Sequence, residues 1–136
     1  MSQWTHVAGI VRIDDLPFIK YTDWQAHFGK QCLFSDNCWK DAREHPDEYL
    51  PMGSEGSLRS ELWRNPDTHH MAAYTVMIFG DLRDYDTPQE IIKWFKQKVA
   101  EIPMVRQAVI TVEMESAKPL TWNYAEDEYE RDRKEG

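Results

Sequence analysis

The chain has 136 residues, enough for one domain, and 41% of them are hydrophobic, so it can bury a core. The formal net charge is −8 and the isoelectric point is about 5.0, which excludes a general nucleic-acid binder because such proteins need a basic surface. Residues 1–4 lack the basic and apolar parts of a signal peptide, and no apolar run is long enough to cross a membrane, so we expect a cytoplasmic protein with no membrane partner.

The first predicted element is a strand at Trp4–Ile13, where apolar and polar residues alternate. A turn at Asp14–Pro17 separates this strand from a short helix predicted at Thr22–Gly29. His27 shares one face of that helix with two aromatic residues, so we expect it to pack against them rather than to bind a ligand.

Residues 31–56 are predicted to form a long irregular insertion, with a short helical turn at Trp39–His45. Cys32 and Cys38 are expected to be a reduced pair, because disulfides are rare in cytosolic proteins. A zinc site normally needs four ligands, and one histidine, His45, follows these cysteines closely. We therefore expect no metal and no cofactor.

Two strands are predicted after the insertion. The first covers Leu58–Trp63, and the turn signal Asn65–Thr68 would join it as a hairpin to a second strand at Ala73–Gly80. Gly80 and the polar residues after it are expected to end the second strand.

A helix is predicted between Thr87 and Pro103, because apolar residues recur there at helical spacing. Thr87 and Glu90 have the spacing of a capping box, and Pro88 suits the first helical position. Pro103 is expected to stop the helix.

The last predicted elements are a strand at Arg106–Glu113 and a short edge strand at Pro119–Tyr124. These elements predict one α+β domain over residues 1–124, which includes the insertion at 31–56. A charged C-terminal tail follows at 125–136.

The order β-α-(insertion)-β-β-α-β is typical of the ferredoxin-like fold, in which two helices cover one face of an antiparallel sheet. The other face would carry no helix, although several of its residues are apolar. Its expected residues include Thr75, Met77, Phe79, Val109 and Thr111. Because an apolar face needs a cover, the insertion, the segment around Tyr124 or a second copy must lie on it, and we expect a homo-oligomer.

A ligand site is suggested by the glycine loop Gly53–Ser57, where the N–H groups of Gly53, Ser54 and Gly56 could hold an anion. The loop lacks the spacing of the known phosphate-binding motifs, so an ordinary loop is the simpler interpretation. Candidate partners for a bound anion are Arg59, Arg64, Arg83 and Arg106, and each of them could equally form a salt bridge.

The polar segment Gly80–Asp86 lies between a strand and a helix, where functional loops often occur. Asp81 and Arg83 could help to hold a cation or an amine- or ribose-bearing ligand. Alternatively, these two residues pair with each other and Asp86 helps to cap the helix.

No motif for a catalytic nucleophile, a zinc protease or a nucleotide-binding loop is present, so no catalytic residue is assigned and an enzyme is not favoured. Aromatic residues near the ends of elements could anchor a partner protein. These candidate interface residues are Trp39, Trp63, Trp122 and Tyr124.

The segments Ala73–Tyr85 and Arg106–Glu113, together with Gly53–Ser57 and Trp4–Ile10, resemble small uncharacterised proteins of phages and prophages. The resemblance covers most of the chain and implies that anti-defence or host-takeover roles belong among the candidates. Such proteins act by binding a host protein or a nucleotide signal.

Three functions follow from these observations. The first is a non-enzymatic, self-associating binding protein that inhibits a host defence protein through surface contacts. The second is a sponge that sequesters a small nucleotide at the glycine loop and the arginines. The third is an enzyme that cleaves a phosphate ester.

Overall fold

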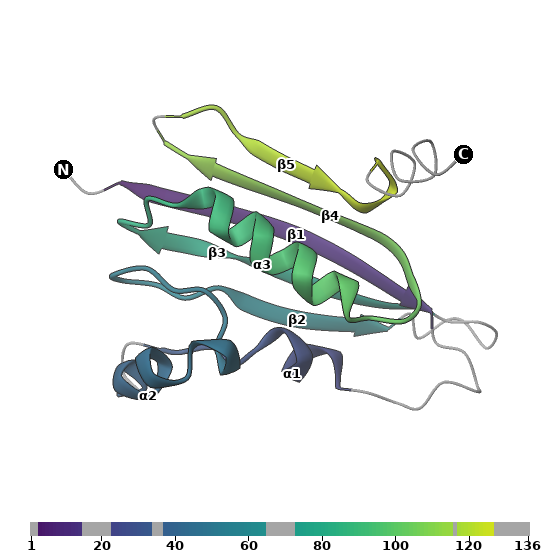
Figure 1. Cartoon of the computed structure of the whole chain (residues 1–136), viewed down its shortest axis with the longest axis horizontal. Coiled ribbons are helices and arrows are strands. Elements are labelled where there is room, and N and C mark those ends of the chain that lie inside the picture. The colour runs from purple at the N-terminus through teal and green to yellow at the C-terminus, as the bar shows by residue number, and fades with distance from the viewer. Residues whose placement is uncertain (1–2, 15–22, 34–36, 65–72, 116, 127–136) are drawn as a thin grey trace.

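The computed structural model describes residues 3–14, 23–33, 37–64, 73–115 and 117–126, which form an α+β structure (Figure 1). In these residues five strands build one antiparallel sheet, accompanied by four helices. The strands are β1 (Trp4–Asp14), β2 (Arg59–Arg64), β3 (Ala73–Arg83), β4 (Val105–Met114) and β5 (Leu120–Asn123). The helices are α1 (Trp24–Phe28), α2 (Trp39–Glu44), the 3-10 helix η2 (Pro46–Glu48) and α3 (Pro88–Ala100).

The strands lie in the order β2-β3-β1-β4-β5, and every neighbouring pair is antiparallel. The first strand of the chain is therefore the central strand of the sheet. Its Ile10 lies opposite Met77 of β3 on one side and opposite Val109 of β4 on the other. The predicted α+β class and antiparallel sheet are confirmed, and the predicted short edge strand is present as β5.

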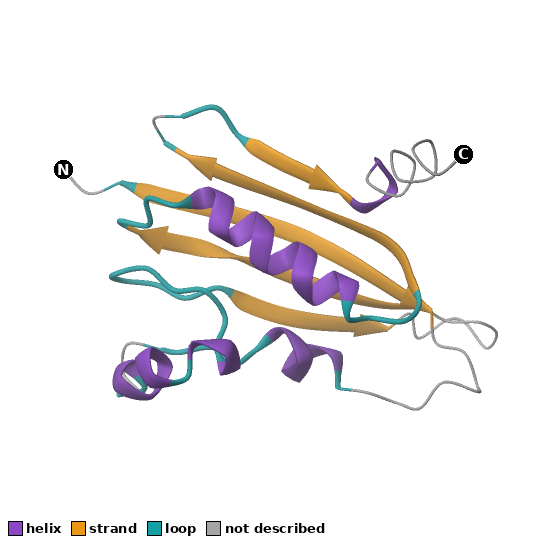
Figure 2. Cartoon of the chain, in the orientation of Figure 1, coloured by secondary structure: helices purple, strands orange, loops and turns teal. Residues whose placement is uncertain are grey.

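Helix α3 lies across one face of the sheet (Figure 2). Its Ile91, Phe95 and Val99 are buried at the spacing predicted for an amphipathic helix. Burial alternates along β1, because successive side chains of a strand point to opposite faces of the sheet. The core between α3 and the sheet includes Val7, Val11, Ile13, Val76, Ile78, Ala108, Ile110 and Val112.

The insertion packs on the same side of the sheet as α3, and β5 directs Trp122 to that side. The ring of Phe28 in α1 lies 6.3 Å from that of Phe95, and Leu50 of the insertion joins the same core. Trp122 of β5 meets the ring of Phe95 edge-on at 5.8 Å. No described helix covers the opposite face of the sheet, which we call the open face.

The helix start differs from the prediction, because the capping box between Thr87 and Glu90 does not form. The Thr87 side chain makes no capping hydrogen bond, and the N–H of Glu90 donates to the main-chain oxygen of Thr87. Burial raises the pKa of the nearby Tyr85, and the Thr87 side chain offsets part of that rise. Pro88 is the first helical residue, as predicted.

Strand β3 is longer than predicted, because Gly80 does not end it. The strand continues to Arg83, and Leu82 is fully buried. Gly80 has a φ of +152°, which glycine adopts easily, and a Cβ there would lie 3.1 Å from the Cα of Leu58. Glycine at this position therefore lets the chain before β2 come close while β3 continues.

The expectation of a reduced cysteine pair is wrong, because Cys32 and Cys38 are joined by a disulfide. Their Cα atoms are 5.8 Å apart, which is the usual separation for a bridged pair. The bond ties Cys38, which precedes α2, to Cys32 at the beginning of the insertion.

Three predicted features lie wholly or mainly outside the described residues. They are most of the turn Asp14–Pro17, the turn Asn65–Thr68 and the tail beyond Glu126. Among the described helices, none has the length and apolar character needed to cross a membrane.

Candidate functional site

The open face carries most of the large hydrophobic side chains that the described residues leave exposed. Of four such side chains, three lie on this face: Ile10 is 37% exposed, Phe79 38% and Trp63 50%. They belong to β1, β3 and β2, where strand alternation directs them away from α3. The fourth, Leu33, belongs to the insertion.

Cross-strand pairing joins Ile10 and Phe79 with their neighbours into a continuous surface. Ile10 lies between Met77 and Val109, and Ala8 lies opposite Phe79 in the next row. Directly opposed residues of a sheet have Cβ atoms about 5 Å apart, so the five side chains are in reach of one another. We call these residues the apolar band, and a patch of this kind marks a contact surface.

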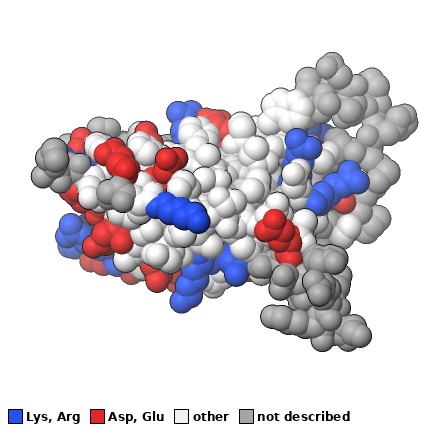
Figure 3. Space-filling model, turned by 90° about the horizontal axis from the view of Figure 1, so that it is seen from above, with Lys and Arg blue, Asp and Glu red and all other residues white. Residues whose placement is uncertain are grey.

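One end of the open face is acidic. The Nδ1 atom of His6 lies 2.5 Å from Oδ1 of Asp81, and its Nε2 atom lies 3.7 Å from Oε1 of Glu115. Glu113 is opposite His6 across the β1–β4 pair, and we call these four residues the acidic end. The hydrogen bond to Asp81 raises the pKa of His6 above 6.5. Figure 3 shows Asp and Glu side chains concentrated at its left, the end of the molecule where β1 begins.

The other end of the open face carries a single cation on β1. Arg12 lies between Thr75 and Gln107 in the sheet, and its side chain is exposed. Among the described residues no carboxylate forms an ion pair with Arg12. The face therefore has opposite charge at its two ends and an apolar band between them.

The glycine loop Gly53–Ser57 uses its main-chain donors inside the protein. The N–H of Gly53 donates to the oxygen of Gly56, and the N–H of Ser54 donates to the oxygen of Arg83. The N–H of Arg83 donates back to a carbonyl of the loop. The loop therefore runs along the end of β3, and two of the three N–H groups predicted to hold an anion are already bonded.

Close approach to β3 also explains why this loop contains glycine. A Cβ atom at Gly56 would overlap the main-chain oxygen of Asp81. The side chains beside it are paired, because Nη1 of Arg83 lies 2.9 Å from Oε2 of Glu55 and Asp81 is bonded to His6. The alternative in which Asp81 and Arg83 pair with each other is therefore wrong.

The remaining candidate arginines do not gather at the glycine loop. Arg59 pairs with Glu61 at 2.6 Å within β2. Arg106 pairs with Asp14 at 3.2 Å, at the end of β1 opposite to the acidic end. The structure thus brings Asp81 and Arg83 beside the loop but places Arg106 far from it.

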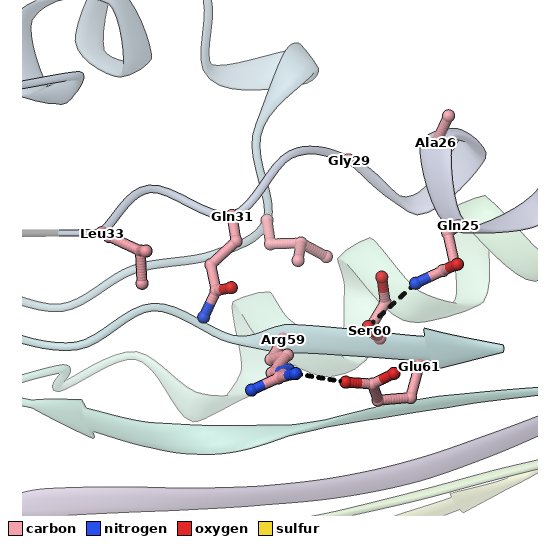
Figure 4. Close-up of a pocket in the computed structure, with 9 residues that line it drawn as sticks. Gln25, Ala26, Gly29, Gln31, Leu33, Arg59, Ser60 and Glu61 are labelled. Carbon is pink, nitrogen blue, oxygen red and sulfur yellow. Dashed lines mark hydrogen bonds and ion pairs between the residues drawn. The ribbon is translucent and has the colours of Figure 1, made fainter. Parts of the chain in front are cut away.

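A pocket of 670 Å³ opens beside the edge strand β2, between that strand, α1 and the beginning of the insertion (Figure 4). Gln25 Nε2 donates to the main-chain oxygen of Ser60 at 3.1 Å across this pocket. The charged residues that line it, Arg59 and Glu61, neutralise each other. The pocket therefore offers no unpaired cation for a phosphate group from its described lining.

The predicted interface aromatics fall in two environments. Trp63 is exposed on the open face. Trp122 and Tyr124 are half-buried on the side of α3, with ring centroids 6.3 Å apart, and Trp39 is half-buried at the start of α2. The structure therefore separates Trp63 from the other three.

No group of three or more His, Cys, Asp and Glu side chains in the described residues is arranged to hold a metal ion. His6 and Asp81 form an acid–base pair, but they are 48% and 62% exposed on the surface of the sheet. Both side chains of the pair are therefore open to water and to a contacting surface.

His6, Ile10 and Arg12 carry no motif in the sequence that marks them as functional residues. They are separated by even numbers of residues in the first strand, which places them on one face. This spacing is the sequence feature that could have identified them. The partners of His6 come from β3 and β4, however, and the pairing register that brings them together is not visible in a single sequence.

Comparison of the chain with protein-family models, curated proteins and solved structures finds no match.

Proposed function

We propose that this chain is a non-enzymatic binding protein that works through contact between its open face and another protein molecule. The observation that carries this proposal is the exposure of Ile10, Phe79 and Trp63 on one face. Complete burial of such a side chain contributes about 1.5–3 kcal/mol. Because each is already half covered or more, a partner would gain about 1 kcal/mol from each of them.

We also assign the fold to the ferredoxin-like class. In support, β2, β3, β1 and β4 are neighbours in that order and antiparallel, and α3 connects β3 to β4. Strand β5 would be an addition at the free edge of β4.

The binding proposal has more support than the nucleotide sponge or the phosphate-ester enzyme. Both of these alternatives need cations that converge on an anion. Arg59, Arg83 and Arg106 instead pair with three different carboxylates, and the three pairs lie in separate parts of the fold.

As the target we propose a host protein of an anti-phage defence system, following the resemblance to phage and prophage proteins. An inhibitor of this kind needs a surface that occupies its target and does not need catalytic groups.

The test uses bacterial strains that each carry one defence system and produce the chain during phage infection. We expect the wild-type chain to restore plaque formation in at least one strain and Ile10→Glu to lose this effect. Leu33→Glu is the matched control, because Leu33 is 48% exposed but lies off the open face. Equal activity of both variants, or no restored strain, would contradict the proposal.

A further inference from the structure

The open face has no cover among the described residues. The sequence suggested three covers: the insertion, the segment around Tyr124 and a second copy of the chain. Leu50 of the insertion and Tyr124 both pack with the core on the side of α3. Of the three covers, we therefore favour the second copy of the chain.

Charge on the open face points to the same occupant. The acidic end has three carboxylates around His6, whereas Arg12 at the other end has no ion-pair partner among the described residues. A surface with opposite charges at its two ends is complementary to itself when two copies meet with their strands in opposite directions.

A two-fold axis that lies between two such sheets, perpendicular to their strands, produces this arrangement. It places the row of His6 against the row of Arg12 in the other copy, and the row of Ala8 against the row of Ile10. Packed sheets lie about 10 Å apart, a gap that the side chains of both copies fill. An arginine side chain can reach a facing carboxylate across that gap.

We propose that the open face is the interface of a symmetric homodimer, in which Arg12 of each copy contacts the acidic end of the other and the two apolar bands pack together. This inference rests on the proposed function in one respect, namely that the open face is a contact surface. It goes further by naming the occupant of the face in the free protein and its orientation, so the second copy and the host target would compete for the open face.

The size of the open face sets the expected strength of dimerisation. Eight residues of β1 across five strands cover about 26 by 19 Å, so two copies would bury about 1,000 Å² in total. Specific interfaces begin at about this size. We therefore expect a reversible dimer whose population depends on concentration.

The first experiment is sedimentation equilibrium of the full chain over a range of concentrations. We expect a monomer–dimer equilibrium for the wild-type chain, and dimerisation weakened about tenfold or more by Ile10→Glu, which places a charge in the apolar band. Leu33→Glu should dimerise like the wild type. Circular dichroism of each variant checks that the fold is retained.

The second experiment tests the orientation by exchanging charges. Arg12→Glu and Glu113→Arg each bring like charges together in the proposed homodimer, so each variant alone should dimerise about tenfold or more weakly than the wild type. In an equimolar mixture of the two variants, both contacts join opposite charges again. We therefore expect the mixture to recover dimerisation, which a general loss of folding could not produce.

A wild-type chain that stays monomeric up to about 1 mM, where even a contact of millimolar affinity would form, overturns the inference. So does a dimer that neither Ile10→Glu nor the charge reversals weaken, or a mixture that stays monomeric. If the wild type is monomeric and Ile10→Glu still loses its effect on plaque formation, the occupant is the host target. In that case the homodimer is wrong while the proposed function stands.

Discussion

Substitution of Gly56 by alanine separates a structural role of the glycine loop from a ligand-binding role. Gly56 has a φ of +87°, and its Cβ position is occupied by the main-chain oxygen of Asp81. An alanine at this φ costs about 1 kcal/mol in backbone conformation alone. The Cβ must also push the loop away from β3, because the facing oxygen belongs to the main chain and is next to the fully buried Leu82.

The loop cannot move without breaking its two main-chain hydrogen bonds with Arg83, at 2.9 and 3.0 Å. Each such bond contributes about 1 kcal/mol net. When the backbone cost of about 1 kcal/mol is added to the loss of these two hydrogen bonds, we expect Gly56→Ala to lower the free energy of unfolding by about 3 kcal/mol.

Urea unfolding followed by tryptophan fluorescence measures this change. Ser54→Ala is the control, because it removes only the exposed hydrogen bonds of a hydroxyl to Arg83 and Asp84 and should change stability by about 0.5 kcal/mol or less. A Gly56→Ala protein with wild-type stability would refute the reasoning. If that protein had also lost a thermal shift caused by a nucleotide, the loop would be a ligand site.

Three further predictions concern the disulfide, the acidic end and the core. Serine at both Cys32 and Cys38 should lower the free energy of unfolding by about 2 kcal/mol in urea titrations, because the bond no longer restricts the unfolded chain. NMR titration should give His6 a pKa above 6.5, and Asp81→Asn should lower that pKa. The stability that the His6–Asp81 pair adds to the folded protein is fully present below pH 6.5 and is lost as the pH rises through the raised pKa. Phe95→Ala should cost about 3–5 kcal/mol in the same urea titrations, because the ring is fully buried.

Each of these predictions has a distinct contrary result. Equal stability of the oxidised protein and the double serine variant would show that the disulfide adds nothing. A His6 pKa that Asp81→Asn leaves unchanged would place the cause of the shift elsewhere. A change of less than about 1 kcal/mol for Phe95→Ala would mean that the core is packed differently.

Alternation along the chain was sufficient to separate the buried and exposed faces of the first strand. In Trp4–Ile13 the period of two residues separates the core side from the open face without any tertiary information. The apolar character of the open face follows from the same pattern, since Met77, Phe79 and Val109 share it. These parts of the fold are local properties, and a single sequence contains them.

The errors concern features that depend on distant neighbours. Gly80 resembled a strand end because its role, the close passage of Leu58, involves a segment 22 positions earlier in the chain. The glycine loop resembled an anion cradle because its carbonyl partner, Arg83, is likewise remote. The Cys32–Cys38 bond was missed for another reason, because the cellular compartment was used to decide the redox state.

The central position of β1 has a consequence for how the molecule folds. Strand β1 is synthesised well before the two strands with which it pairs, as in the contact between Thr5 and Met114. Loop closure over such separations is slow, so folding should be slower than in helical proteins of similar size. While the chain is being synthesised, β1 has neither neighbour, and the nascent protein must keep this apolar segment from aggregating until β3 and β4 emerge.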